Sequence, residues 1–145
     1  IEQAKQGPLV SPGEYTVTLR VDGREATRPL VVRKDPNSAG TDAQIRAQET
    51  LAVEIRDGTN EVVSLINRIE WVRKQLEEFR SMAPSMRFPA DLVKAAEQVD
   101  AEARAIEDRL VHPTIHEGDA KSFRGPMGLY LELLWLQAEL DAQQD

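Results

Sequence analysis

The chain has 145 residues, of which 41% are hydrophobic and 30% charged, with a formal net charge of −7 and no cysteine. This composition is typical of a globular chain and excludes an intrinsically disordered one. The negative charge argues against a nucleic-acid or anionic-membrane partner, because both select a basic protein face. Without cysteine there are no disulfides, thiolate nucleophiles or cysteine metal sites. No run of about 18 apolar residues is present, so we expect no membrane span.

The first predicted element is a β-hairpin in residues 13–34. Apolar residues alternate with polar ones from Tyr15 to Val21, which is the period of a half-buried strand. Asp22-Gly23 predicts the tight turn, because Gly tolerates the positive φ that such a turn requires. A two-residue turn would pair Tyr15 with Leu30, but it would also set Arg28 opposite an apolar residue, so the pattern leaves the register open.

The return strand, about residues 26–33, contains Pro29. Proline cannot donate to a ladder, so it indicates an edge strand or a bulge. An isolated two-stranded hairpin is marginal in water, and this one is therefore expected to pack on the rest of the chain or to pair with other strands.

From Thr41 the apolar period becomes helical, and a first helix is predicted over about residues 42–80. Gly58 is its weak point, but Ile55 and Val62 stay in phase across it, which favours a continuous helix. The apolar stripe comprises Ile45, Ala52, Ile55, Val62, Ile66, Ile69, Leu76 and Phe79, widened by Leu51, Leu65 and Val72. Residues 81–89 contain two prolines and are predicted to form a turn.

Two further helices are predicted over about residues 90–111 and 129–143. The second has a heptad seam of Leu92, Ala96, Val99, Ala103, Ile106 and Leu110, and the third has one of Leu129, Leu133, Leu136 and Leu140. The predicted fold class is mainly α: an elongated antiparallel three-helix bundle, in up-down-up order, with an N-terminal β-hairpin. The expected division is 1–36 for the hairpin and 37–145 for the bundle.

The segment from His112 to Asp119 is the one cluster of candidate ligand types, with His112, His116, Glu117 and Asp119. Imidazole and carboxylate both suit a divalent ion. Pro113 breaks any helix that would align the two histidines, so a polar surface loop is the preferred interpretation. We therefore assign no metal, catalytic or cofactor-binding residue, and we expect no cofactor.

Other charged and aromatic residues have structural interpretations. The carboxylates Glu77-Glu78, Glu107-Asp108 and Glu132 are predicted on solvated helix faces. The basic residues Arg68, Arg73, Lys74 and Arg80 are predicted to form surface salt bridges with neighbouring glutamates. Trp71 and Trp135 are predicted to lie in the bundle core, the alternative being an exposed patch that docks a second protein or domain.

Several segments of the chain also resemble parts of a known protein family. Pro12-Gly13-Glu14-Tyr15-Thr16-Val17, the Asp22-Gly23 turn and the exit Leu30-Val31-Val32-Arg33-Lys34-Asp35-Pro36 resemble the end of the Ig-like segment of bacterial sortilin-type, BNR-repeat glycosyl-hydrolase-like exported proteins. A helical tail follows this segment in the family. Its first long helix resembles Ala47-Gln48 through Leu51-Ala52, Ile55-Arg56-Asp57 and Asn67-Arg68-Ile69, and its last helix is similar to Gly125-Pro126 with Leu129-Tyr130 and Leu133-Leu134-Trp135-Leu136. The resemblance implies a periplasmic or extracellular C-terminal accessory module, a tyrosine-corner role for Tyr15, and partner Ig-like and propeller domains upstream in a longer parent chain.

The expected function is non-catalytic: protein–protein interaction or dimerisation within a larger exported propeller protein. A homodimer would form through the hairpin edge or the third helix. The alternative is part of a glycoside-hydrolase-like enzyme, with sugar or metal binding through the 112–119 loop.

Overall fold

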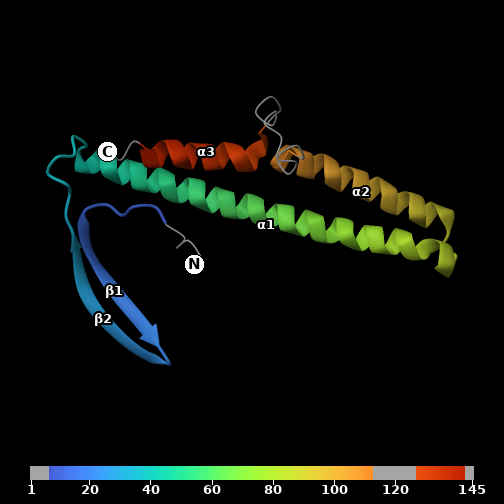
Figure 1. Ribbon diagram of the computed structural model, residues 1–145, viewed down its shortest axis with the longest axis horizontal. Coiled ribbons are helices and arrows are strands. Elements are labelled where there is room, and N and C mark those ends of the chain that lie inside the picture. Colours follow the sequence, from blue (N-terminus) through green and yellow to red (C-terminus); the bar gives the residue numbers. More distant parts are fainter. Residues whose placement is uncertain (1–6, 113–126, 143–145) are drawn as a thin grey trace.

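The computed structural model describes residues 7–112 and 127–142, and it is mainly helical (Figure 1). An antiparallel hairpin, β1 (Gly13–Val21) and β2 (Arg24–Val32), is followed by α1 (Asp42–Met86), α2 (Ala90–Leu110) and α3 (Gly128–Ala142). The predicted fold class, a helical bundle with an N-terminal hairpin, is confirmed.

The hairpin closes through the predicted turn. Asp22 and Gly23 have φ values of 48° and 76°, and two successive positive φ values define the type I′ turn that matches the twist of paired strands. The turn fixes the register that the sequence left open: Tyr15 lies opposite Leu30, and Val17 lies opposite Arg28.

Pro29 occupies an edge position without a bulge. The strands pair one to one from Gly13–Val32 to Val21–Arg24, and hydrogen-bonded pairs alternate with non-hydrogen-bonded pairs. Counted from the pair that closes the two-residue turn, Thr16 and Pro29 form a non-hydrogen-bonded pair. The missing N–H of Pro29 therefore belongs to the outer edge of β2, and the ladder loses no bond.

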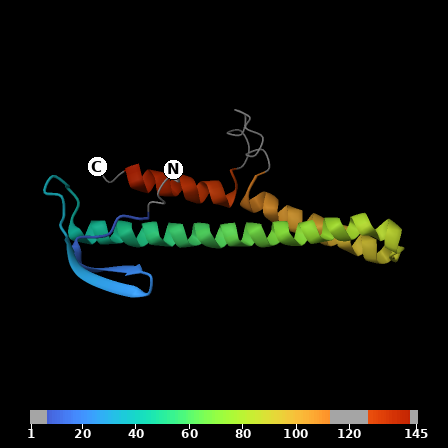
Figure 2. The same ribbon diagram turned by 60° about the horizontal axis from the view of Figure 1, so that its bottom comes forward.

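The hairpin projects away from the helices and touches them at its base (Figures 1 and 2). The amide of Ser11 donates to Glu49 Oε2 of α1 over 3.1 Å, and the hydroxyl of Tyr15 donates to the carbonyl of Ser11 over 2.6 Å. Beyond the base, the apolar face of the hairpin is open, with Leu19 63% exposed and Val17 50% exposed.

Helix α1 starts at a complete capping box. The Gln44 amide donates to the Thr41 hydroxyl, and the Thr41 amide donates to the Gln44 side chain. The helix then runs unbroken through Gly58 for 45 residues, which is about 67 Å at 1.5 Å per residue. The predicted continuity across Gly58 is confirmed.

The predicted turn over residues 81–89 is wrong for residues 81–86, which extend α1 to Met86. Pro84 removes one amide donor only two residues before Met86, the last residue of the helix, so the loss is confined to the last turn. Packing compensates, because Ala83 is buried and the Phe79 and Phe88 rings stack at 4.8 Å. The helix ends at its C-cap residue, Arg87, whose backbone is left-handed with φ 53°.

Helices α2 and α3 lie end to end along α1, and both run antiparallel to it (Figure 1). The Gln48 side chain donates to the carbonyl of Leu140 over 3.0 Å, which joins the start of α1 to the end of α3. The predicted up-down-up order is therefore wrong, and the third helix repeats the direction of the second. The reason is length: α2 and α3 have 21 and 15 residues, together fewer than the 45 of α1.

The core is consequently one layer between two helices. The α1 side of this interface keeps a strict alternation of three and four residues, which is the a/d seam of a coiled coil: Ile45, Gln48, Ala52, Ile55, Thr59, Val62, Ile66, Ile69, Arg73, Leu76, Arg80 and Ala83. Among the described residues only six apolar side chains are buried: Ala52, Ile55, Val62, Ile69, Ala83 and Ala96.

Candidate interaction surface

The seam of α2 differs from the prediction. Ala96, Ala103 and Leu110 lie on the side facing α1 as expected, but Leu92, Val99 and Ile106 are 47%, 47% and 48% exposed. Their predicted places in the seam are taken by Val93, Asp100 and Glu107, which are less exposed. The helix is rotated by one position because Asp100 and Glu107 form ion pairs with α1.

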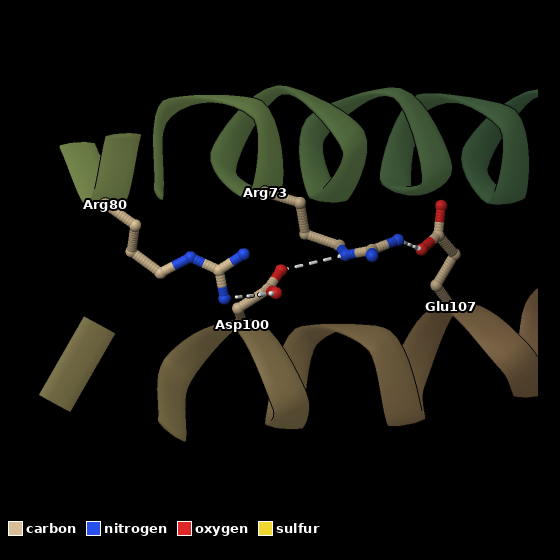
Figure 3. Close-up of polar contacts among 4 residues, drawn as sticks. All are labelled: Arg73, Arg80, Asp100 and Glu107. Carbon is tan, nitrogen blue, oxygen red and sulfur yellow. Dashed lines mark hydrogen bonds and ion pairs between the residues drawn. The ribbon is translucent and has the colours of Figure 1, made fainter. Parts of the chain in front are cut away.

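Arg73 is the centre of these ion pairs (Figure 3). Its Nε donates to Asp100 Oδ1 over 3.0 Å, and its Nη1 donates to Glu107 Oε2. Arg80 donates to the second oxygen of Asp100 over 3.5 Å. Side-chain exposures of 28% for Arg73, 21% for Asp100 and 12% for Glu107 place the group in the interface.

These contacts affect ionisation. Partial burial by itself would lower the pKa of Arg73, but the hydrogen bonds to Asp100 and Glu107 outweigh it and raise that pKa above its ordinary value. The Arg73 guanidinium therefore stays charged over the whole working pH range, and its ion pairs fix the rotation of α2. It is structural, since each carboxylate already accepts from an arginine. The predicted solvated-face position of Glu107 is wrong.

The rotation exposes what we call the apolar strip. On all three helices most residues at heptad position g, which lies beside position d on the helix surface, are large and apolar. They are Leu51, Leu65, Val72, Phe79 and Met86 on α1, Leu92, Val99 and Ile106 on α2, and Leu129 and Leu136 on α3. All but Phe79, which is part-buried, are between 41% and 63% exposed.

Antiparallel packing brings these rows together. When two helices pair antiparallel through a/d seams, position g of one lies beside position g of the other, on one side of the pair. The opposite side carries position e, which is mainly polar on α1, with Glu49, Arg56, Glu70 and Glu77. The strip therefore runs along one side of the helices, with α3 and then α2 completing its second row.

The α3 half of the strip has two further features. Gly58 occupies the g position between Leu51 and Leu65, and a Cβ built there would meet nothing within 4 Å. It leaves a notch in the strip where another backbone can approach closely. Position c, which flanks g on the outer side, is acidic in this half: Glu54, Glu61, Glu132 and Glu139, all exposed.

The predicted core positions of the two tryptophans are wrong. Trp71 is 68% exposed and Trp135 is 58% exposed. Each falls at heptad position f, directly opposite the seam, so neither contributes to the interface or to the strip. The apolarity of α3 misled the prediction, because a helix apolar on several sides need not be buried on all of them.

The other candidate residues are dispersed. Glu77, Glu78, Asp108 and Glu132 are exposed, as are Arg68 and Lys74, whereas Arg73 and Arg80 enter the interface. His116, Glu117 and Asp119 lie outside the described residues. Within 7–112 and 127–142, no group of three or more His, Asp or Glu side chains is arranged to hold a metal ion.

A cleft of about 350 Å³ lies between the base of the hairpin and the start of α1. Leu9, Val10, Ile45 and Ala52 form much of its wall. Its polar lining includes Lys34, Asp35 and Glu49, and Glu49 already accepts from the amide of Ser11. The cleft therefore lies where the hairpin meets the helices, and it has both apolar and charged walls.

Among the described helices, none combines the length and apolarity needed to cross a bilayer. The comparisons with known proteins found no matching family, no matching curated protein and no matching solved structure.

Proposed function

We propose that the chain is a non-catalytic protein-interaction module, and that the apolar strip is its binding face. The observation that supports this proposal is the imbalance of apolar side chains: ten line one side of the helices, nine of them more than 40% exposed, while six are buried in the described parts of the chain. A contiguous apolar band of this kind marks an interaction site more often than ordinary surface.

The chemistry of the strip suggests an amphipathic helix as its partner. The strip is straight and runs along a helix pair, which suits the apolar face of a third helix laid into a groove. Its α3 half is flanked by Glu54, Glu61, Glu132 and Glu139, so the partner helix carries Lys or Arg beside its apolar face. Gly58 is the point of closest approach.

The wider setting comes from the sequence resemblance alone. As part of the proposal, the module belongs to the C-terminal end of an exported propeller protein, where the partner helix is supplied by another domain or another protein. The rival enzymatic role depends on the 112–119 loop, most of which lies outside the described residues.

A pair of synthetic peptides tests the binding face. Both are amphipathic helices with the same leucine face, one with lysines and the other with glutamates beside it. Calorimetric titration at low and moderate salt is expected to show binding of the lysine peptide, weakened by salt, and at least about tenfold weaker binding of the glutamate peptide.

Two variants distinguish binding at the apolar strip from non-specific attraction of a basic peptide to an acidic protein. Leu136→Lys places a charge in the strip, whereas Leu134→Lys places the same charge on another side of α3, at a residue 39% exposed. Only Leu136→Lys is expected to weaken binding of the lysine peptide. Equal losses in the two variants, or no binding by the wild type, would contradict the proposal.

A further inference from the structure

The two outer edges of the hairpin are not equivalent. The outward N–H and C=O groups of β1 belong to its non-hydrogen-bonded residues, Glu14, Thr16, Thr18 and Arg20. On β2 the corresponding residues are Glu25, Thr27, Pro29 and Val31. Pro29 removes a donor from the middle of that row, which protects β2 against strand addition. The edge of β1 has no such protection.

The β1 edge is exposed along its whole length. Glu14, Thr16, Thr18 and Arg20 are all exposed. The nearest charged contact is within the hairpin, where Arg20 pairs with Glu25 over 2.7 Å. That pair lies in solvent, with side-chain exposures of 78% and 49%, and it leaves both backbone groups of Arg20 free to face outward.

The edge is also self-complementary in one register. If two β1 strands pair antiparallel about a two-fold axis centred on Val17, Glu14 lies opposite the partner's Arg20, and Thr16 lies opposite the partner's Thr18. The symmetry repeats both pairs. Opposite charges and Thr–Thr pairs stabilise antiparallel strands. A shift of one step along the edge, to a centre at Thr18, would instead oppose Glu14 to the partner's Asp22, which are like charges.

The same register aligns the apolar face. Val17 lies opposite the partner's Val17, and Tyr15 lies opposite the partner's Leu19, on the face where Val17 and Leu19 are 50% and 63% exposed. The dimer then contains a four-stranded sheet in place of a two-stranded ribbon. Three or more strands with an apolar face are the size at which a sheet becomes stable on its own.

We propose that the outer edge of β1 binds a second copy of this chain, strand to strand and antiparallel, in the register that pairs Glu14 with the partner's Arg20. The partner is a second copy because the edge complements itself in charge and in apolar pattern. This inference goes beyond the proposed function, because it uses a surface distinct from the apolar strip.

Two proline variants on one rung of the hairpin test the edge. Thr18 and Thr27 lie opposite each other in a non-hydrogen-bonded pair, so proline at either position removes an outward donor and spares the ladder. Sedimentation velocity over a concentration series is expected to show a dimer for the wild type and for Thr27→Pro. Thr18→Pro is expected to be a monomer over the same concentrations.

Charge exchange tests the register. Glu14→Arg alone and Arg20→Glu alone each create two like-charge contacts, and each is expected to weaken the dimer at least about tenfold. A mixture of the two single variants is expected to form a heterodimer, because every contact then joins Arg to Glu. The double variant carrying both substitutions is expected to dimerise again.

Several results would overturn the inference: a wild type that stays monomeric at every concentration, equal effects of Thr18→Pro and Thr27→Pro, or no recovery in the mixture. If the proline variants unfold the hairpin, NMR contacts between Tyr15 and Leu30 will be lost, and the charge-exchange experiment then decides alone. Peptide binding to the apolar strip is measured in a separate experiment, so either proposal can fail while the other is still tested.

Discussion

Arg73 of α1 donates to Asp100 of α2 over 3.0 Å at a point where the heptads of both helices place a seam residue. A polar pair at this position fixes which face of α2 meets α1, because any other rotation would leave half-buried charges without partners. Its consequence for the surface is direct: Leu92, Val99 and Ile106 are turned outward into the apolar strip.

Truncation of this arginine is expected to destabilise the protein. Arg73→Ala leaves Glu107 without its partner and Asp100 with only Arg80, and the expected loss is about 1–3 kcal/mol in the free energy of unfolding. Arg68→Ala, at an exposed position of the same helix, is the matched control and should change it by less than about 0.5 kcal/mol. Urea unfolding measures both, and equal effects would contradict a structural role for the ion pairs.

Arginine and lysine at position 73 are expected to give different stabilities at alkaline pH. The raised pKa of Arg73 means that its contribution to stability is present below the unfolded pKa and is lost only at a pH above the range in which proteins are studied. In Arg73→Lys the ammonium group, with an ordinary pKa of about 10.4, starts to lose its proton within that range. The variant should lose melting temperature relative to wild type between about pH 9 and pH 11, and parallel curves would argue against the mechanism.

Two glycines are expected to respond to alanine with opposite signs. Gly58 is inside α1, where an added methyl group would meet only open space, so Gly58→Ala should stabilise by about 1 kcal/mol through helix propensity. Gly128 has φ +72°, and a Cβ there would lie 2.9 Å from the carbonyl oxygen of Leu110. Gly128→Ala should therefore destabilise by about 1–3 kcal/mol. Thermal melts compare the pair.

The hydroxyl of Tyr15 is expected to hold the base of the hairpin. Tyr15→Phe removes its hydrogen bond to the Ser11 carbonyl and should reduce local stability by about 1 kcal/mol. Hydrogen exchange of the β1 and β2 amides should accelerate, whereas exchange in the middle of α1 should not. Uniform acceleration along the chain would instead indicate global destabilisation.

Both tryptophans should be open to solvent in the folded protein. Trp71 and Trp135 are more than half exposed, so acrylamide should quench their fluorescence nearly as well in the native as in the unfolded state. Strong protection of either residue would show that another surface covers it in solution.

Local patterns predicted most of the secondary structure. Alternation from Tyr15 to Val21 and the Asp22-Gly23 turn were sufficient for the hairpin, because both express backbone geometry within a few residues. Gly58 did not break α1, since Ile55 and Val62 keep the seam in phase on either side. The end of α1 was missed because a proline in the last turn removes only one donor.

The packing of the helices against one another could not be predicted from local patterns in the same way. The apolar row with Leu92, Val99 and Ile106 forms as clean a heptad as the true seam, and only the partner at Arg73 decides between them. The direction of α3 depends on the length of α1 relative to two other helices. The strip itself left a signal in Leu51, Leu65 and Val72, which widen the stripe beyond what one neighbour can cover.

The length of α1 also sets a distance. One continuous helix of about 67 Å carries the hairpin at its first turn and the connection to α2 at its last, and α2 and α3 brace it along its length (Figure 2). Anything held at the hairpin is thereby kept a fixed span from anything held at the far end. The helices thus set a spacing as well as a surface, and removing whole heptads from α1 together with the facing turns of α2 or α3 would bring the two ends closer while keeping the a/d seam in phase.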